Sequence, residues 1–106
     1  MDVTLEQALQ AARTADPSER IQFRDAIATH GQAGIDAVTP WLADPSLGYF
    51  AGQVIWKAGD LGERDTAVNV LREALDDPTV AMGRGDVAML LHKLGYSAPK
   101  PAAYRR

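Results

Sequence analysis

The side chains that could do acid–base or metal chemistry are few and scattered in this sequence. The two histidines, His30 and His92, lie far apart. Neither belongs to an H-x-x-x-H or H-E-x-x-H pattern, which would place two imidazoles on one helix face to bind zinc. Both are expected near helix C-termini, where the helix dipole favours an imidazolium. The absence of cysteine excludes disulfides, thiol catalysis and cysteine-based zinc sites. We expect neither a metal ion nor a cofactor.

The carboxylates are better explained as helix starts than as a catalytic pair. Asp16, Asp44 and Asp77 each precede a proline. Asp-Pro is typical of a helix N-terminus, with aspartate as the cap and proline at the first helical position. The glycine-containing segment 83–86 lacks the Lys-Ser/Thr of a phosphate-binding loop, and no Gly-x-Ser-x-Gly motif is present. The sequence therefore predicts that the protein is not an enzyme.

A second set of residues is suited to binding a partner. On the helix expected over 46–59, an aromatic and polar stripe lies beside the apolar core face, and the helix expected over 79–94 carries methionines and polar groups in the same register. Tyr, Trp and Met are favoured interface anchors, and Tyr49 and Trp56 are the expected hot spots. The candidate partner-binding residues are Tyr49, Gln53, Trp56, Met82, Arg84, Asp86, Met89 and Lys93. The alternative, that this stripe packs one helical unit against the next, stays open.

Six helices are expected from the apolar periodicity and from start and stop signals. They cover 5–14, 17–30, 33–43, 46–59, 63–76 and 79–94. Thr4 and Gln7 form a capping-box pattern at the first helix, Gly31 suits a left-handed helix end, and Pro40 should kink the third helix. No strand pattern persists. Residues 96–106 have two prolines and no apolar period, and we expect them to be a flexible tail.

The expected helices recur with a period of 33 residues. Shifting the chain by 33 positions places the Asp-Pro pair at 44–45 on the pair at 77–78, and Gly62 on Gly95. The repeated unit is a helix, an Asp-Pro turn, a second helix and a glycine. The units cover 4–31, 33–62 and 64–95. The first unit fits more loosely, as a terminal cap does. We therefore expect one domain over residues 1–95.

The segment 37–45 resembles a HEAT repeat, with Pro40 in the first helix and Asp44 at the turn. Arg84 matches the arginine frequent in the second helix of that family. The resemblance implies an all-α fold, a short right-handed α-solenoid of three helix hairpins whose second helices line the partner-binding face. The alternative fold is a six-helix bundle in which the repeat survives only in the sequence.

Composition and charge favour a small soluble helical domain and do not indicate any particular chemistry. The chain is 46% hydrophobic with a net charge of −3. It has no apolar run near the ~18 residues of a membrane span and no secretory signal pattern, so we expect a cytoplasmic location. We expect a non-catalytic protein-interaction or scaffold module. Its partner would be another protein or a subunit of a larger assembly. Self-association through the C-terminal end is suggested by Met82, Met89, Leu90 and Leu91.

The alternative function is nucleic-acid binding. It would use Arg13, Arg20, Arg24 and the basic tail. The tail contains Lys100, Arg105 and Arg106. An isoelectric point near 5.2 argues against it, because nucleic-acid-binding domains usually carry a basic stripe and a high isoelectric point.

Overall fold

The computed structural model describes residues 4–96, which are helical without any strand. The elements are α1 (Leu5–Thr14), α2 (Pro17–Arg20), the 3-10 turn η1 (Ile21–Phe23), α3 (Arg24–Ala28), α4 (Gln32–Val38), the 3-10 turn η2 (Thr39–Ala43), α5 (Gly48–Ala58), the π turn η3 (Gly59–Glu63), α6 (Arg64–Leu75) and α7 (Arg84–Lys93). Within the described range, no helix has the length and apolar character needed to cross a membrane. The prediction of an all-helical fold is confirmed.

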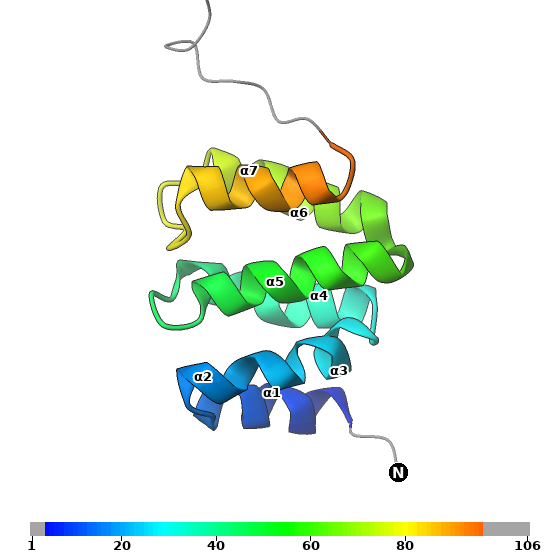
Figure 1. Cartoon of the computed structure of the whole chain (residues 1–106), viewed down its shortest axis with the longest axis vertical. Coiled ribbons are helices and arrows are strands. Elements are labelled where there is room, and N and C mark those ends of the chain that lie inside the picture. The colour runs from blue at the N-terminus through cyan, green and yellow to red at the C-terminus, as the bar shows by residue number, and fades with distance from the viewer. Residues whose placement is uncertain (1–3, 97–106) are drawn as a thin grey trace, which may run out of the picture.

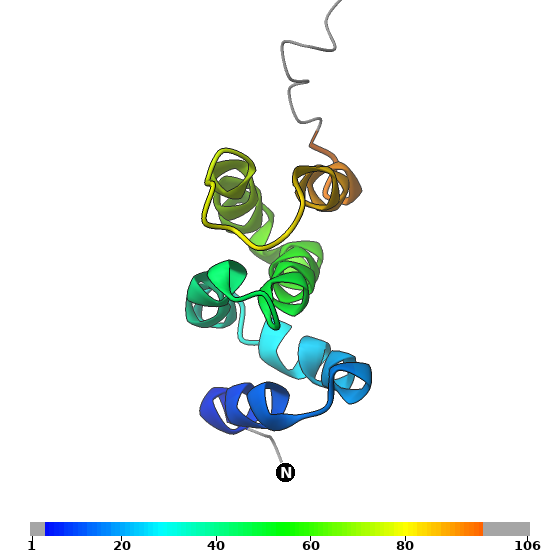
Figure 2. The same cartoon turned by 90° about the vertical axis from the view of Figure 1, so that its left-hand side faces the viewer.

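The helices lie in three layers that follow one another along the long axis (Figure 1). The first layer holds α1 with α2 and α3, the second holds α4 with α5, and the third holds α6 with α7. The side view shows two columns, with α1, α4 and α6 in one and α2–α3, α5 and α7 in the other (Figure 2). The helices that follow the Asp-Pro turns therefore share one side of the molecule.

Helix α5 occupies the centre of the fold. It contacts α3, α4, α6 and α7, and seven of its 11 residues are buried. The largest fully buried side chains come from all three layers, so the core is continuous along the stack. These side chains are Ile27, Ile35, Val38, Val54, Ile55, Leu71, Val87 and Leu91.

Close helix approach depends on glycines that have no room for a side chain. A Cβ on Gly34 of α4 would collide with the carbonyl oxygen of Ile27 at the end of α3. A Cβ on Gly59 would lie 2.7 Å from the Cβ of Ala67 in α6. Because interiors pack at crystal-like density, an extra methyl group at these points would push the layers apart.

Two of the predicted helix starts are wrong in position. Helix α5 begins at Gly48 and α7 at Arg84, later than the Asp-Pro pairs predicted. The Oδ1 of Asp77 instead accepts hydrogen bonds from the Thr79 hydroxyl (2.6 Å) and the Thr79 backbone N–H (2.8 Å), and these two bonds lower the pKa of Asp77. Such side-chain turns compete with helix formation. The capping box at Thr4 is confirmed.

The backbone also tests the predictions made for Pro40, Gly31 and the second helix. At Pro40 the α-helix gives way to the 3-10 turn η2, as an interior proline requires. Gly31 has a positive φ of 62°, which favours glycine, but its ψ of −130° differs from that of the left-handed helical conformation expected at a helix end. The helix predicted over 17–30 is interrupted, because η1 separates α2 from α3.

Arg20 is buried, and its guanidinium joins the first two layers through hydrogen bonds. Only 8% of it is exposed. Its Nε donates to the Ala12 carbonyl (2.7 Å), its Nη2 to the Ala15 carbonyl (3.0 Å) and its Nη1 to the Ser46 carbonyl (3.1 Å). The guanidinium thus satisfies the free carbonyls at the end of α1 and joins them to the turn that precedes α5.

Tyr96 belongs to the folded domain. Its backbone N–H donates to the Leu91 carbonyl (2.9 Å), and its ring packs against the core with the guanidinium of Arg72 5.4 Å from the ring centroid. Tyr96, the first residue of the predicted tail, therefore packs against the helical domain. The rest of the predicted tail, 97–106, lies outside the described residues.

A glycine pair tests the packing of the layers. We expect Gly34→Ala to lower the free energy of unfolding by about 1–3 kcal/mol, because the added methyl meets backbone that cannot move aside. Gly85→Ala in α7 is the matched control, since a Cβ there meets nothing within 4 Å. It should raise stability by about 0.5–1 kcal/mol through helix propensity. Urea unfolding measures both; equal shifts in the two variants contradict the packing model.

A second test concerns the buried arginine. We expect Arg20→Ala to cost about 2–3 kcal/mol of stability, because charge-assisted hydrogen bonds to three carbonyls are lost. Arg13→Ala is the control, since Arg13 is exposed and makes no hydrogen bond or ion pair among the described residues. Its guanidinium lies 5.9 Å from the Trp41 ring centroid, a contact of about 0.5–1 kcal/mol. The measurement is thermal unfolding of both variants. A loss of stability for Arg20→Ala no larger than that for Arg13→Ala would contradict a stabilising role of the buried guanidinium.

Candidate functional site

A small hollow lies between α5 and α7 and is formed by residues that the sequence singled out. Its volume is about 40 Å³. It is lined by Tyr49, Gln53, Met82, Asp86, Met89, Leu90 and Lys93. Six of the eight predicted binding residues thus meet around one feature. We call the exposed or half-buried members of this region, together with Trp56, the α5–α7 surface: Tyr49, Gln53, Trp56, Asp86, Met89 and Lys93.

The aromatic and methionine residues divide between packing and exposure. Met82 is 8% exposed, and it lies over Gly52, where a Cβ would collide with the Met82 sulfur. Tyr49 and Met89 are 60% and 61% exposed. Whether the stripe packs between helical units or faces solvent therefore differs from residue to residue. Met82 packs between layers, whereas Tyr49 and Met89 are apolar side chains facing solvent.

Trp56 is half-buried and is surrounded by cations. Its ring centroid lies 4.8 Å from the Lys93 Nζ, 5.5 Å from the Arg24 Cζ and 5.8 Å from the Lys57 Nζ. These side chains belong to α7, α3 and α5, so all three layers contribute. Sequence reasoning placed Trp56 and Lys93 on one stripe but missed the other two. Lys57 directly follows Trp56 in α5, whereas no sequence signal places Arg24 beside this ring.

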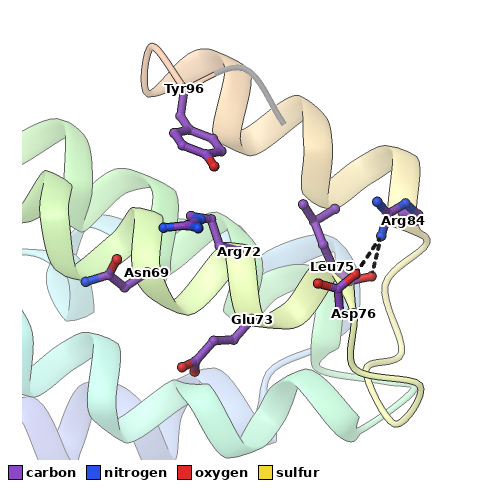
Figure 3. A pocket seen from close by; sticks show the side chains of 7 residues that line it. All are labelled: Asn69, Arg72, Glu73, Leu75, Asp76, Arg84 and Tyr96. Carbon is purple, nitrogen blue, oxygen red and sulfur yellow. Dashed lines mark hydrogen bonds and ion pairs between the residues drawn. The ribbon is translucent and has the colours of Figure 1, made fainter. Parts of the chain in front are cut away.

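Arg84 is not part of the α5–α7 surface. Its Nη1 donates to the Leu75 carbonyl (2.6 Å) and lies 3.4 Å from the Asp76 Oδ1 (Figure 3). Arg84 thus binds the last carbonyl of α6, as Arg20 binds the carbonyls at the end of α1. The predicted role of Arg84 in partner binding has no support in this position, where Arg84 instead closes the loop between α6 and α7.

Arg84 also borders a second, open hollow between α6 and α7, with a volume of about 510 Å³. It is lined by Asn69, Arg72, Glu73, Leu75, Asp76, Arg84 and Tyr96 (Figure 3). Its charged side chains are of both signs.

The arginines predicted for nucleic-acid binding do not form one cluster. Arg20 is buried on backbone carbonyls, Arg13 lies over the Trp41 ring, and Arg24 lies over the Trp56 ring and pairs with Asp25 at 2.9 Å. The three side chains thus contact three separate places. The basic residues of the predicted tail, Lys100, Arg105 and Arg106, lie outside the described residues.

The structure also places the two histidines and the residues that suggested self-association. His30 and His92 are exposed. Among residues 4–96, no three histidine, aspartate or glutamate side chains are grouped so that they could hold a metal ion.

Of the side chains that suggested self-association, Leu90 and Leu91 are buried with Met82, and only Met89 is exposed. That prediction stays untested, with a smaller apolar surface to support it.

Comparison with protein-family models, with curated proteins and with solved structures gives no significant match. The function must therefore be argued from the side chains themselves.

The two methionines of this region should respond differently to truncation. We expect Met82→Ala to lower the free energy of unfolding by about 2 kcal/mol or more, because it empties space over Gly52. Met89→Ala should change it by less than about 0.5 kcal/mol, because most of Met89 is already in solvent. Chemical unfolding of both variants is the measurement. A large loss for Met89→Ala means that Met89 is a core residue and not a surface one.

Proposed function

We propose that this protein is a non-catalytic protein-interaction module that binds its partner at the α5–α7 surface. The observation that carries the proposal is the exposure of two large side chains, Tyr49 at 60% and Met89 at 61%, on either side of a hollow. Exposed apolar side chains around a shallow depression are typical of interaction sites, and Tyr and Met are enriched in such sites.

The size of the hollow supports a macromolecular partner over a small molecule. Small-molecule sites usually enclose about 300–1,000 Å³. The hollow between α5 and α7 has about 40 Å³, enough for the end of one side chain. A partner would insert one apolar group there and cover Tyr49 and Met89, while Gln53 and Asp86 at the same surface would supply polar contacts.

We further propose that the architecture is a short HEAT-like α-solenoid, with the second helices of its three units on the binding side. The 33-residue repeat, the three layers and the two columns support this proposal. So does the shared role of Arg20 and Arg84, because each binds the last carbonyls of the preceding helix in its own layer. In stacked repeats each unit contacts only its neighbours, which leaves long continuous faces for partners.

The proposal is tested by capture of partners from a lysate of the native cell. The full chain serves as bait, and the double variant Tyr49→Ala/Met89→Ala is compared with wild type by quantitative mass spectrometry. We expect the specific partner to be lost with the double variant, because interface energy is concentrated in a few large side chains. Leu61→Ala is the control, since Leu61 is 52% exposed but lies in η3, outside the surface. Retention of every wild-type partner by the double variant would overturn the proposal.

A further inference from the structure

Three cationic side chains from three layers converge on one aromatic ring. The Lys93 ammonium, the Arg24 guanidinium and the Lys57 ammonium lie 4.8, 5.5 and 5.8 Å from the centroid of Trp56. Each distance is within the ~6 Å at which a cation is attracted to a ring face. The negative face of the indole therefore holds positive charges together at a single point of the surface.

The positive charge at this point is only partly balanced within the chain. Arg24 pairs with Asp25 at 2.9 Å, and Lys57 lies 3.8 Å from Asp60. Lys93 has no carboxylate within ion-pair distance among residues 4–96. Because like charges around one ring repel one another, a carboxylate that arrived here would relieve this repulsion and gain an ion pair with Lys93.

The cationic end is continuous with the apolar part of the α5–α7 surface. Asp86, Met89 and Lys93 are spaced three and four residues apart on α7, so they follow one another along one helix face. All three line the same hollow. The surface thus runs from a negative end at Asp86, through exposed Met89 and Tyr49, to a positive end at Lys93 and Trp56.

We propose that the partner presents an acidic segment, in which one apolar side chain enters the hollow and neighbouring carboxylates contact Lys93 and Arg24. This inference rests on the proposed function and adds the chemistry of the partner. A protein segment fits better than a nucleic acid, because Asp25, Asp60 and Asp86 adjoin the cations and would repel a continuous phosphate backbone. Charge complementarity of this kind sets specificity and association rate.

The test selects a display library of random dodecapeptides on the immobilised full chain. We expect enriched peptides to carry two or more Asp or Glu residues beside a Leu, Phe or Met. Binding of the enriched peptides should weaken about tenfold or more in Lys93→Gln, because an ion pair with an uncompensated ammonium is lost. The binding should also weaken as salt is added.

Arg72→Gln is the matched control. Arg72 is a cation over an aromatic ring, Tyr96, at 5.4 Å, but it belongs to α6 and lies outside the α5–α7 surface. Its removal should leave peptide binding unchanged, so a general effect of lost positive charge is separated from a local one. The inference is overturned if no peptide is enriched, if the enriched peptides are neutral or basic, or if both variants lose binding equally. Competition by a duplex oligonucleotide at the same site would also overturn it, in favour of phosphate recognition.

Failure of this inference is distinguishable from failure of the proposed function. In the capture experiment, a partner that is lost with Tyr49→Ala/Met89→Ala but kept with Lys93→Gln supports the surface and rejects the acidic segment. A partner kept by both variants rejects the surface itself.

Discussion

The fold depends on one helix that has neighbours on several sides. Helix α5 lies between α3 and α7 in its own column and also contacts α4 and α6 of the other column. A helix in this position has little surface for polar residues, and α5 is accordingly rich in small and aliphatic side chains. Gly52 and Gly59 lie where Met82 and Ala67 come close. The third layer can approach the central one only because these positions have no side chain.

The same constraint determines where the candidate surface lies. With most of α5 buried, only the stripe that contains Tyr49, Gln53 and Trp56 reaches solvent or the edge of the neighbouring helix. The corresponding stripe of α7 lies beside it, because both helices belong to one column. The candidate surface is thus the part of the helix–helix contact that packing leaves uncovered.

Much of the fold follows from local patterns, whereas the charged contacts do not. Apolar periodicity predicts the helices, and the repeat predicts that residues of α5 and α7 share one register. The Asp-Pro pairs were less informative, because Asp44 and Asp77 accept hydrogen bonds within their own turns and α5 and α7 begin later. Turn and helix start use the same residues, so the sequence alone cannot separate them.

The roles of the arginines could not be inferred from sequence because they depend on contacts between distant segments. Arg20 and Arg24 are close in the chain, yet one is buried on backbone carbonyls and the other lies over Trp56. Both are arginines in the second half of the first unit, with no local feature that distinguishes them. Only the docking of one layer on the next decides which guanidinium is buried and which stays half-buried at the surface.

The hollow has one wall from each of two layers, which makes recognition inseparable from the integrity of the stack. A ligand held between Tyr49 of α5 and Met89 of α7 binds only molecules in which the last layer is docked. By mass action, such a ligand at a hundred times its dissociation constant adds about 2.7 kcal/mol to the docked state. Occupancy would therefore protect the amide protons of α7 from exchange, although the ligand touches only one face of that helix.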